Sequence, residues 1–424
     1  MLRYHTSMKI FAVGGAIRDE LLKLEVRERD WAVVGGSAQQ LIAKGYKPVG
    51  KDFPVFLHPK TGEEYALART ERKVGPGYHG FSFDTSKKVT LEEDLGRRDL
   101  TINAMARDSS GNIIDPYDGQ TDLKNRLLRH ISPAFSEDPL RILRVARFAA
   151  RFNKIGFTVA KETQKLMKKM VSAGEADSLK PDRVWKETEK ALAGPTPEVY
   201  FKVLRDCSAL SKVFPEINDL FGIPQPEKWH PEVDTGVHTL MALGIAASLT
   251  DSVAVRFATL THDLGKATSP KETLPKHHGH EKRSVEILNV FCSRFPIPKR
   301  YRELAVAVAQ QHGMAHKVKE LKPSTIYKLL KNIDGLRRPE RFEKFILACE
   351  ADARGRTGFE NHHYYQADLL RIALNAAREV SVKDLGNIEH GPNLGERLRE
   401  YRIKAIHHAL ADKQSNSASE ITPR

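Results

Sequence analysis

The chain has 424 residues, with 68 Lys and Arg against 54 Asp and Glu, a formal net charge of +14 and a pI near 9.5. This length allows two or more domains with a sizeable core, and the excess of positive charge favours a polyanionic partner. Three widely spaced cysteines, no signal-peptide pattern and no apolar run near about 20 residues argue against a disulfide scaffold, secretion and a membrane span, and fit a cytoplasmic protein.

A glycine pair follows the first predicted strand. Residues 9–13 are mostly apolar and end at Gly14 and Gly15, after which residues 16–24 are predicted to form a helix. Glycine lets backbone N–H groups come close to a ligand, and the free N–H groups of a helix N-terminus favour phosphate oxygens. Arg18 adds a guanidinium whose fork suits phosphate. The segment therefore predicts a phosphate-binding loop.

Two carboxylates stand at the start of the second predicted strand, residues 30–34. Glu28 and Asp30 are spaced i, i+2, so in an extended chain their side chains share one face. Such a pair can hold Mg²⁺ ions against a triphosphate. A glycine pair or a carboxylate pair alone is common on protein surfaces, and it is their conjunction that predicts a nucleotide and metal site.

The remaining pattern divides the chain into a mixed head and a helical body. Up to about residue 130, short apolar runs alternate with Gly- and Asp-rich turns, which indicates a small α/β or α+β head. Further strands are predicted at 53–57, 63–69 and 112–114, helices at 38–44 and 99–107, and a mobile loop at 72–78.

From Ser136 onward the pattern predicts helices and no strands. A Pro-rich connector at 223–231 is the main predicted boundary, and the polar, Ser-rich end from 413 to 424 is predicted to be disordered. The predicted helices are 138–152, 159–172, 181–193, 197–206, 236–249, 253–263, 280–294, 299–312, 323–332, 338–353, 365–379 and 393–411.

The first of these helices carries a ridge of charge. Asp138, Arg141, Arg144 and Arg147 recur every three residues. Arginine used in place of lysine favours recognition of phosphates or planar bases, with a salt-bridged surface helix as the alternative. Arg98, in a pair of arginines before this ridge, is a weaker candidate contact for ribose or phosphate.

A second candidate metal site lies further along the chain. An adjacent histidine and aspartate in the apolar helix predicted at 253–263 are costly to bury unless they are paired or metal-bound. Imidazole with carboxylate suits a transition metal, Mg²⁺ or Mn²⁺, which can activate water for phosphoester hydrolysis. Asp334 and Asp352 are both candidates for a final carboxylate, and His277 lies in the same run of histidines. The candidate ligands are His238, His262, Asp263, His278, His280 and His312.

Together these residues resemble the bacterial class II tRNA nucleotidyltransferases, the CCA-adding enzymes, in the form that carries an HD phosphohydrolase domain. The matching motifs lie at 14–19, 97–99, 137–147, 262–263 and 355–358. The resemblance implies an α+β fold, in which a small mixed-sheet head of the polymerase-β type precedes an all-helical neck, body and tail containing an HD domain. The implied divisions are a head at 1–135, a neck and RNA-binding region at 136–222, the HD domain at 235–336 and a tail at 337–412.

The resemblance also implies template-independent addition and repair of the 3′-terminal CCA of tRNA from CTP and ATP. Glu28 and Asp30 would bind Mg²⁺, and Asp138 with Arg141 would present hydrogen-bonding edges that select C or A. The residues implied to hold the nucleotide are Gly15, Arg18, Arg98, Asp138, Arg141, Arg144 and Arg147. The family's Asp-x-Asp pattern is Glu28-Arg29-Asp30 in this chain, from which we expect retained but slower transfer.

For the HD domain the resemblance implies 2′,3′-cyclic phosphodiesterase, 2′-nucleotidase and phosphatase activity with a divalent transition metal such as Ni²⁺. The implied partners are tRNA, CTP and ATP, without a membrane, for a monomer or a homodimer. Two alternatives stay open: a bacterial poly(A) polymerase, and an HD phosphohydrolase whose transferase head is inactive.

Overall fold

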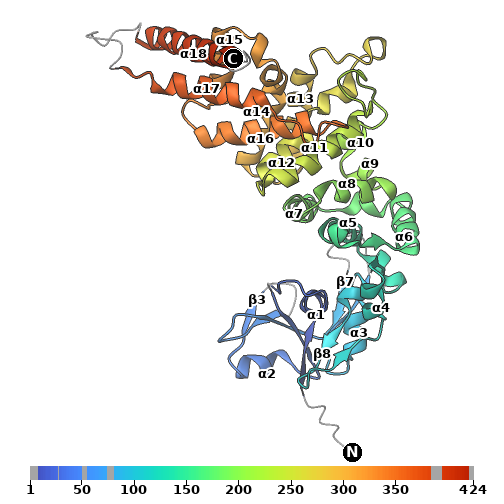
Figure 1. The fold of residues 1–424 in the computed structure, drawn as a ribbon. Helices are drawn as coiled ribbons and strands as arrows, with labels where there is room; N and C mark the ends of the chain where they lie inside the picture. The colour runs from blue at the N-terminus through green and yellow to red at the C-terminus, as the bar shows by residue number, and fades with distance from the viewer. Residues whose placement is uncertain (1–7, 27, 50–54, 74–80, 383–393, 420–424) are drawn as a thin grey trace, which may run out of the picture. The chain divides into compact units, whose positions relative to one another are not determined.

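The computed structural model of the chain describes residues 8–26, 28–49, 55–73, 81–382 and 394–419 (Figure 1). It divides into two compact units. The first comprises Met1–Thr188 and Val199–Val213, and the second comprises Glu189–Glu198 and Phe214–Arg424.

The first unit contains a mixed sheet of seven strands in the order β3-β4-β5-β2-β1-β8-β9. The central strands β1 and β2 are antiparallel, and β2 and β5 are parallel. The strands are β1 (Lys9–Val13), β2 (Asp30–Val34), β3 (Lys47–Val49), β4 (Val55–Leu57), β5 (Glu64–Leu67), β8 (Ala106–Arg107) and β9 (Ile113–Ile114). A separate antiparallel pair is formed by β6 (Thr70–Lys73) and β7 (Phe81–Asp84).

Successive residues of a strand point to opposite sides of a sheet, and both faces of the seven-stranded sheet carry buried apolar residues. Ala32 packs with Val13 and Leu95 on one face, whereas Val33 packs with Leu41 on the other. The helices of this part are α1 (Gly15–Leu21), α2 (Ala38–Ala43), α3 (Leu91–Gly96) and α4 (Gly119–Lys124). Leu95 belongs to α3 and Leu41 to α2, so these two helices cover opposite faces.

The helical part of the first unit begins at α5 (Leu140–Phe152), whose buried residues Ile142, Leu143, Ala146 and Ala150 form its apolar face. Pro139 precedes it with helical dihedral angles, which suits a helix start. The following helices are α6 (Lys161–Ser172), α7 (Pro181–Leu192), α8 (Pro197–Asp206) and α9 (Leu210–Val213), and the last residues of α7 and the first of α8 belong to the second unit.

In the second unit, α12, α14 and α16 all pack against one another, and α11 packs against α12 and α16. Apart from short 3₁₀ turns, the described residues there are helices and connections. The helices are α10 (Pro215–Asn218), α11 (Thr235–Leu249), α12 (Val253–Thr261), α13 (His280–Arg294), α14 (Lys299–His316), α15 (Pro323–Asn332), α16 (Pro339–Arg354), α17 (Tyr365–Glu379) and α18 (Leu394–Ser419).

The structure corrects one predicted helix. Residues 99–107 form a short 3₁₀ helix, η1 (Thr101–Asn103), and then strand β8, instead of an α-helix. Ala106 pairs with Val13 of β1, so the last residues of this segment belong to the sheet as strand β8. The Asp99 side chain accepts hydrogen bonds from Leu100 N at 2.9 Å and Asn103 Nδ2 at 2.8 Å, which favours a tight turn over a regular helix.

Three smaller expectations also differ from the structure. A two-residue strand, β11 (Thr158–Val159), pairs in parallel with β10 (Leu127–Leu128), so strands do not end at Ser136. In the segment predicted to be disordered from 413, α18 continues to Ser419, because no Gly or Pro interrupts it after Gly395. Of the loop predicted at 72–78, residues 72 and 73 belong to β6 and the rest lies outside the described residues.

Candidate active sites

The glycine turn after β1 brings backbone and guanidinium groups together. Gly14 has φ +74° and is the N-cap of α1, and its N–H donates to Met105 O at 3.0 Å. A Cβ at Gly14 would lie 2.6 Å from Nη1 of Arg98, and one at Gly15 would lie 3.2 Å from Nη2 of Arg18. The turn therefore needs glycine both for its positive φ and for the close approach of two arginines.

Asp30 lines a pocket of about 190 Å³ beside the sheet. Asp30 is in register with Val13 of β1 on one side and with Glu64 of β5 on the other. Both acids line the pocket together with Arg98. Glu64 was not predicted from the sequence, because only the pairing of β2 with β5 brings it beside Asp30.

Glu28 lies in the coil before β2, since the strand begins at Asp30, and it is exposed. It does not line the pocket, but its charge acts on Asp30. Burial raises the pKa of the Asp30 carboxyl, the Arg98 guanidinium lowers it, and the negative charge of Glu28 raises it again. A divalent cation would relieve this repulsion, and oxygen-only donors are those that Mg²⁺ prefers. The residues present therefore fit a magnesium site.

Arg98 is held in place by a buried carboxylate. Asp94, only 2% exposed, accepts from Arg97 Nη2 at 2.9 Å and lies 3.3 Å from Arg98 Nη2. Arg98, two residues after the end of α3, therefore lies near both Gly14 and Asp30. This arrangement places one positive charge between the glycine turn and the carboxylates.

Arg18 is 3% exposed, and its Nε donates to Asp19 Oδ1 at 2.9 Å while Nη1 donates to Asn103. It also stacks on the rings of Phe148 and Phe152, with centroid distances of 5.1 and 5.0 Å. Burial lowers the pKa of the guanidinium, and Asp19 opposes that effect. Arg18 is therefore buried against the glycine turn, next to Gly15.

The arginine ridge on α5 is anchored to the 97–99 segment. Arg144 Nε donates to Asp99 Oδ2 at 2.7 Å, and Arg141 Nη2 donates to Arg97 O at 2.5 Å. Burial would raise the pKa of Asp99, but Arg144 and the hydrogen bond from Asn103 hold it well below its usual range. The ridge and the glycine turn are therefore joined through residues 97–99.

The other ridge residues are also bonded. Arg147 Nε donates to Glu187 at 2.5 Å, and Asp138 accepts from Arg183 Nη2 at 3.0 Å and from Leu140 N at 3.0 Å. Arg147, like Arg144, bonds to its carboxylate partner through Nε. The planar fork of such an arginine can contact a ligand through its terminal nitrogens.

In the second unit, three histidines point the same ring nitrogen toward one place. His262, His280 and His312 each donate from Nδ1 to a backbone carbonyl, of Thr259 at 2.7 Å, His277 at 2.8 Å and Val308 at 2.9 Å respectively. This fixes the tautomer and leaves Nε2 as the ligand atom, an arrangement typical of metal-binding histidines.

The three Nε2 atoms surround Asp263. They lie 3.1, 3.3 and 3.6 Å from its carboxylate oxygens for His262, His280 and His312. Within the described part of the chain, Asp263 Oδ1 and His262 Nε2 are buried without a hydrogen bond. Nitrogen and oxygen donors that face one another in this way suit a divalent transition metal.

Asp352 on α16 completes this cluster. Its Oδ1 lies 2.9 Å from His238 Nε2 and 3.5 Å from His262 Nε2. Burial would lower the pKa of His262, but Asp263 and Asp352 outweigh it and raise the value to about 10. The carboxylates therefore favour a positive charge at the centre of the cluster, as a metal site requires.

The end of the Pro-rich connector lies beside this cluster, with His230 in the connector and Glu232 directly after it. Glu232 Oε1 lies 3.0 Å from Nδ1 of both His230 and His238, and the Glu232 carboxylate is 2% exposed. Lys266 Nζ lies 2.7 Å from Asp263, and His316 Nε2 lies 2.7 Å from Asp352. These residues were not among the sequence candidates, because nothing in their local spacing separates them from other polar residues.

Two sequence candidates lie away from the cluster. His278 is exposed and belongs to none of the described groups that could hold a metal, and Asp334 pairs with Arg338 at 3.2 Å. His277 bonds through both ring nitrogens, to Ser269 Oγ at 2.8 Å and Pro224 O at 3.0 Å. Of the two candidate carboxylates, the structure brings Asp352 to the histidines.

The fold and the two sites define a class of protein: a nucleotidyltransferase head combined with an HD metal domain. Three family models match the chain in this order. The Poly A polymerase head domain matches residues 10–129, the probable RNA and SrmB-binding site of polymerase A matches 156–221, and the HD domain matches 235–338.

Two curated relatives cover almost the whole chain. The multifunctional CCA protein of Thioalkalivibrio sulfidiphilus is 60% identical over 96% of this chain and 99% of its own length. The multifunctional CCA protein of Nitrosococcus oceani is 56% identical over 95% and 99%. The chain therefore belongs to the multifunctional CCA protein family, which confirms the resemblance drawn from the motifs.

Solved structures share the fold. A CCA-adding enzyme in its apo form II has a TM-score of 0.63 at 20% identity, over 97% of this chain and 92% of its own. The Thermotoga maritima CCA-adding enzyme complexed with tRNA has a TM-score of 0.59 at 19% identity, over 96% and 91%. The predicted fold, a mixed-sheet head with a helical body that contains an HD domain, is confirmed. Among the described residues, no helix combines the length and apolar character needed to cross a membrane.

Proposed function

We propose that this protein adds and repairs the 3′-terminal CCA of tRNA from CTP and ATP without a nucleic-acid template, and that its HD cluster hydrolyses phosphoesters. The observation that carries the transferase assignment is the position of Arg98, which lines one pocket with Asp30 and also lies against the Gly14 turn. Membership of the multifunctional CCA protein family supports both activities.

In the transferase reaction the tRNA 3′-hydroxyl attacks the α-phosphorus of the incoming nucleotide, and pyrophosphate leaves. Glu28 and Asp30 would hold Mg²⁺, which stabilises the attacking and leaving oxygens. The N–H groups at Gly15 and the Arg98 guanidinium bind triphosphate oxygens, since α1 begins at Gly15. Arg18, buried beneath them, keeps the turn in shape.

Nucleotide selection falls to the ridge on α5. Asp138 accepts from an exocyclic amine and Arg141 donates to base acceptors, a pattern that C and A satisfy and that G and U do not. Arg141 is 7% exposed and bonded to Ala134 O at 2.8 Å, so its position is fixed by the protein. Arg144 and Arg147, each anchored through Nε, contact the nucleotide through their terminal nitrogens.

The HD cluster would hold a divalent transition metal such as Ni²⁺, whose role is to activate a water for attack on phosphorus. His238, His262, Asp263 and Asp352 meet at its centre, with His280 and His312 beside Asp263. The buried Lys266 ammonium, 2.7 Å from Asp263, balances the carboxylate charge. Cyclic phosphodiesters and 2′-phosphates of RNA ends are the proposed substrates.

The direct test is incubation of a tRNA that lacks CCA with CTP, ATP and Mg²⁺, followed by sequencing of the product. A three-nucleotide addition that stops supports the proposal, whereas a long A tract would indicate a poly(A) polymerase. Loss of incorporation with phosphodiesterase activity retained would indicate an HD hydrolase whose head only binds RNA. Magnesium replacement by other ions, and metal analysis of the purified protein, identify the two metals.

A further inference from the structure

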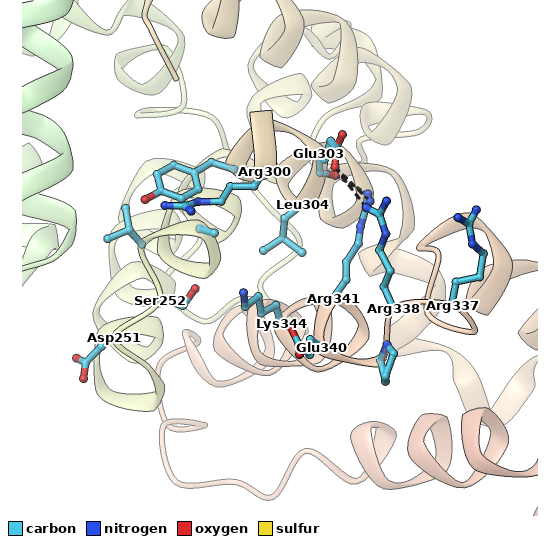
Figure 2. A pocket seen from close by; sticks show the side chains of 14 residues that line it. Asp251, Ser252, Arg300, Glu303, Leu304, Arg337, Arg338, Glu340, Arg341 and Lys344 are labelled. Atoms are coloured by element: carbon cyan, nitrogen blue, oxygen red, sulfur yellow. Dashed lines mark hydrogen bonds and ion pairs between the residues drawn. The ribbon is translucent and has the colours of Figure 1, made fainter. Parts of the chain in front are cut away.

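The second unit contains a pocket of about 720 Å³ that neither proposed activity uses (Figure 2). It is lined by the starts of three helices: Ser252 to Ala254 at α12, Arg300 to Leu304 at α14, and Pro339 to Lys344 at α16. Its volume lies in the range of about 300–1,000 Å³ that is typical of small-molecule sites.

The lining is rich in cationic side chains. Carboxylates are fewer, and two of them are already engaged. Glu303 lies 3.5 Å from Arg341 and 3.9 Å from Arg338, as the dashed lines in Figure 2 mark, and Asp251 lies 3.2 Å from Arg256. The five cations are Arg300, Arg337, Arg338, Arg341 and Lys344, and the three carboxylates are Asp251, Glu303 and Glu340.

Two donors in this pocket make no hydrogen bond within the described residues. Arg341 Nε is buried and, within the described residues, makes no hydrogen bond. Ser252 is the N-cap of α12, but its hydroxyl does not cap the helix. Both residues line the pocket beside the exposed Lys344. Free donors and a surplus of positive charge suit an anion with several oxygens.

The three helices add to this charge. α12, α14 and α16, of 9, 18 and 16 residues, begin at the pocket, so their positive dipole ends point into it. Val253, Leu304 and Pro339 supply apolar wall between the charged groups. A concave site with phosphate-binding groups around an apolar wall matches a nucleotide better than an extended RNA backbone, which is bound along open basic surface.

We propose that this pocket binds a free nucleoside polyphosphate, with its phosphates on Arg341, Lys344 and Ser252 and its base against Leu304 and Pro339. The site is distinct from the HD cluster. The same helices reach that cluster with His262, His312 and Asp352, about 12 Å further along each helix at a rise of 1.5 Å per residue.

Calorimetric titration with α,β-methylene-ATP and Mg²⁺, without tRNA, tests the proposal. Wild-type protein is expected to bind two nucleotides per chain, one in the head and one in the pocket. The double variant Arg300→Ala/Lys344→Ala is expected to bind one, because the second affinity falls at least about tenfold when two cations are lost. The matched control is Lys328→Ala, an exposed lysine on α15 outside the pocket, which should keep two.

Glu303→Gln gives a change in the opposite direction. Release of Arg341 from this carboxylate should tighten the second site severalfold, while Arg338 stays paired with Asp334. CCA addition should stay unchanged in every variant. A single binding site in both wild type and double variant would overturn the proposal. So would a double variant that keeps its nucleotide stoichiometry and loses affinity for tRNA, since the pocket would then bind RNA phosphates. If the second nucleotide site is absent, the result of the CCA-addition assay does not change, so the two proposals are tested separately.

Discussion

The two candidate active sites differ in the burial and the charge balance of the residues that could hold a divalent cation. In the head, Asp30 begins the central strand β2 and Glu28 lies in the coil before it, and their charges repel each other beside Arg98. In the HD cluster, histidines and carboxylates are buried and already compensate one another in charge. The head site suits a hard, exchangeable ion that arrives with its nucleotide, and the HD site suits a resident transition metal.

Because of this difference, substitution of a ligand residue should affect activity and stability differently at the two sites. Removal of an exposed carboxylate such as Asp30 should cost little folding free energy, so its loss should appear mainly as a lower rate of nucleotide transfer. Removal of a buried carboxylate that balances imidazoles should cost more, because an uncompensated charge remains in the interior. Activity and stability should therefore separate in the head and move together in the HD cluster.

The largest effect is expected for Asp30→Asn. Loss of this carboxylate should lower CTP and ATP incorporation about 10³-fold or more, because Glu28 alone would hold Mg²⁺ weakly. Hydrolysis of 2′,3′-cyclic phosphates and the melting temperature should stay within error. A parallel fall in hydrolysis would show that the two sites are not independent.

Asp263→Asn should reverse this pattern. Phosphodiesterase activity is expected to fall about 10²-fold, since three Nε2 atoms lose their shared carboxylate, and thermal stability should fall by a few degrees. CCA addition, measured on the same preparation, is the control. His278→Ala serves as the matched variant, because His278 is exposed and outside the cluster; loss of hydrolysis in that variant would contradict the ligand assignment.

An intermediate effect is expected for Asp99→Asn, which removes the anchor of Arg144. Transfer should fall about tenfold, and the free energy of unfolding at pH 7 by about 3 kcal/mol. The folded pKa of Asp99 lies below its ordinary value of 3.8. Its contribution is therefore present above that value and lost as the pH falls toward the folded pKa.

Acid titration of unfolding checks this sign. Below about pH 4 the wild type should lose stability more steeply than Asp99→Asn, so that the two curves converge. Asp182→Asn, an exposed carboxyl on α7, is the control and should follow the wild type. A constant gap between wild type and Asp99→Asn down to pH 2 would show that the anchor does not act through charge.

The smallest effect is expected for Glu28→Asp. We expect restoration of the shorter side chain to raise the transfer rate by less than about fivefold, because Glu28 lies in coil and can adapt its reach. Single-turnover incorporation of CTP into a tRNA that lacks CCA measures this change. A slower variant would show that the site is adapted to glutamate.

The sequence predicted the bounds of those strands and helices that depend mainly on the local pattern of apolar and polar residues. β1 and β2 have the predicted bounds, since an apolar run that ends at glycines or begins at a carboxylate is visible along the chain. Helices 197–206, 280–294, 323–332 and 365–379 were also predicted to the residue. Segment 99–107 was wrong because strand pairing with β1 overrides its helical pattern.

The candidate site residues also divide into those that local sequence identifies and those that only tertiary packing identifies. His262 and Asp263 were found because a charged pair in an apolar helix is a local signal. Asp352 could not be separated from Asp334, since only the packing of α11 against α16 brings Asp352 to His238. Glu64 was missed for the same reason, because only the pairing of β2 with β5 brings it beside Asp30. Glu232 is close in sequence to His230 and His238, but its local spacing does not distinguish it from other polar residues.

The bonds of His238 determine how the HD domain can be excised. The family model spans residues 235–338, yet the two carboxylates that hold this imidazole, Glu232 and Asp352, lie on either side of that span. A fragment trimmed to those borders would keep the His-Asp dyad and discard both neighbours of the first histidine. Recombinant dissection of the hydrolase should therefore retain the connector and all of α16.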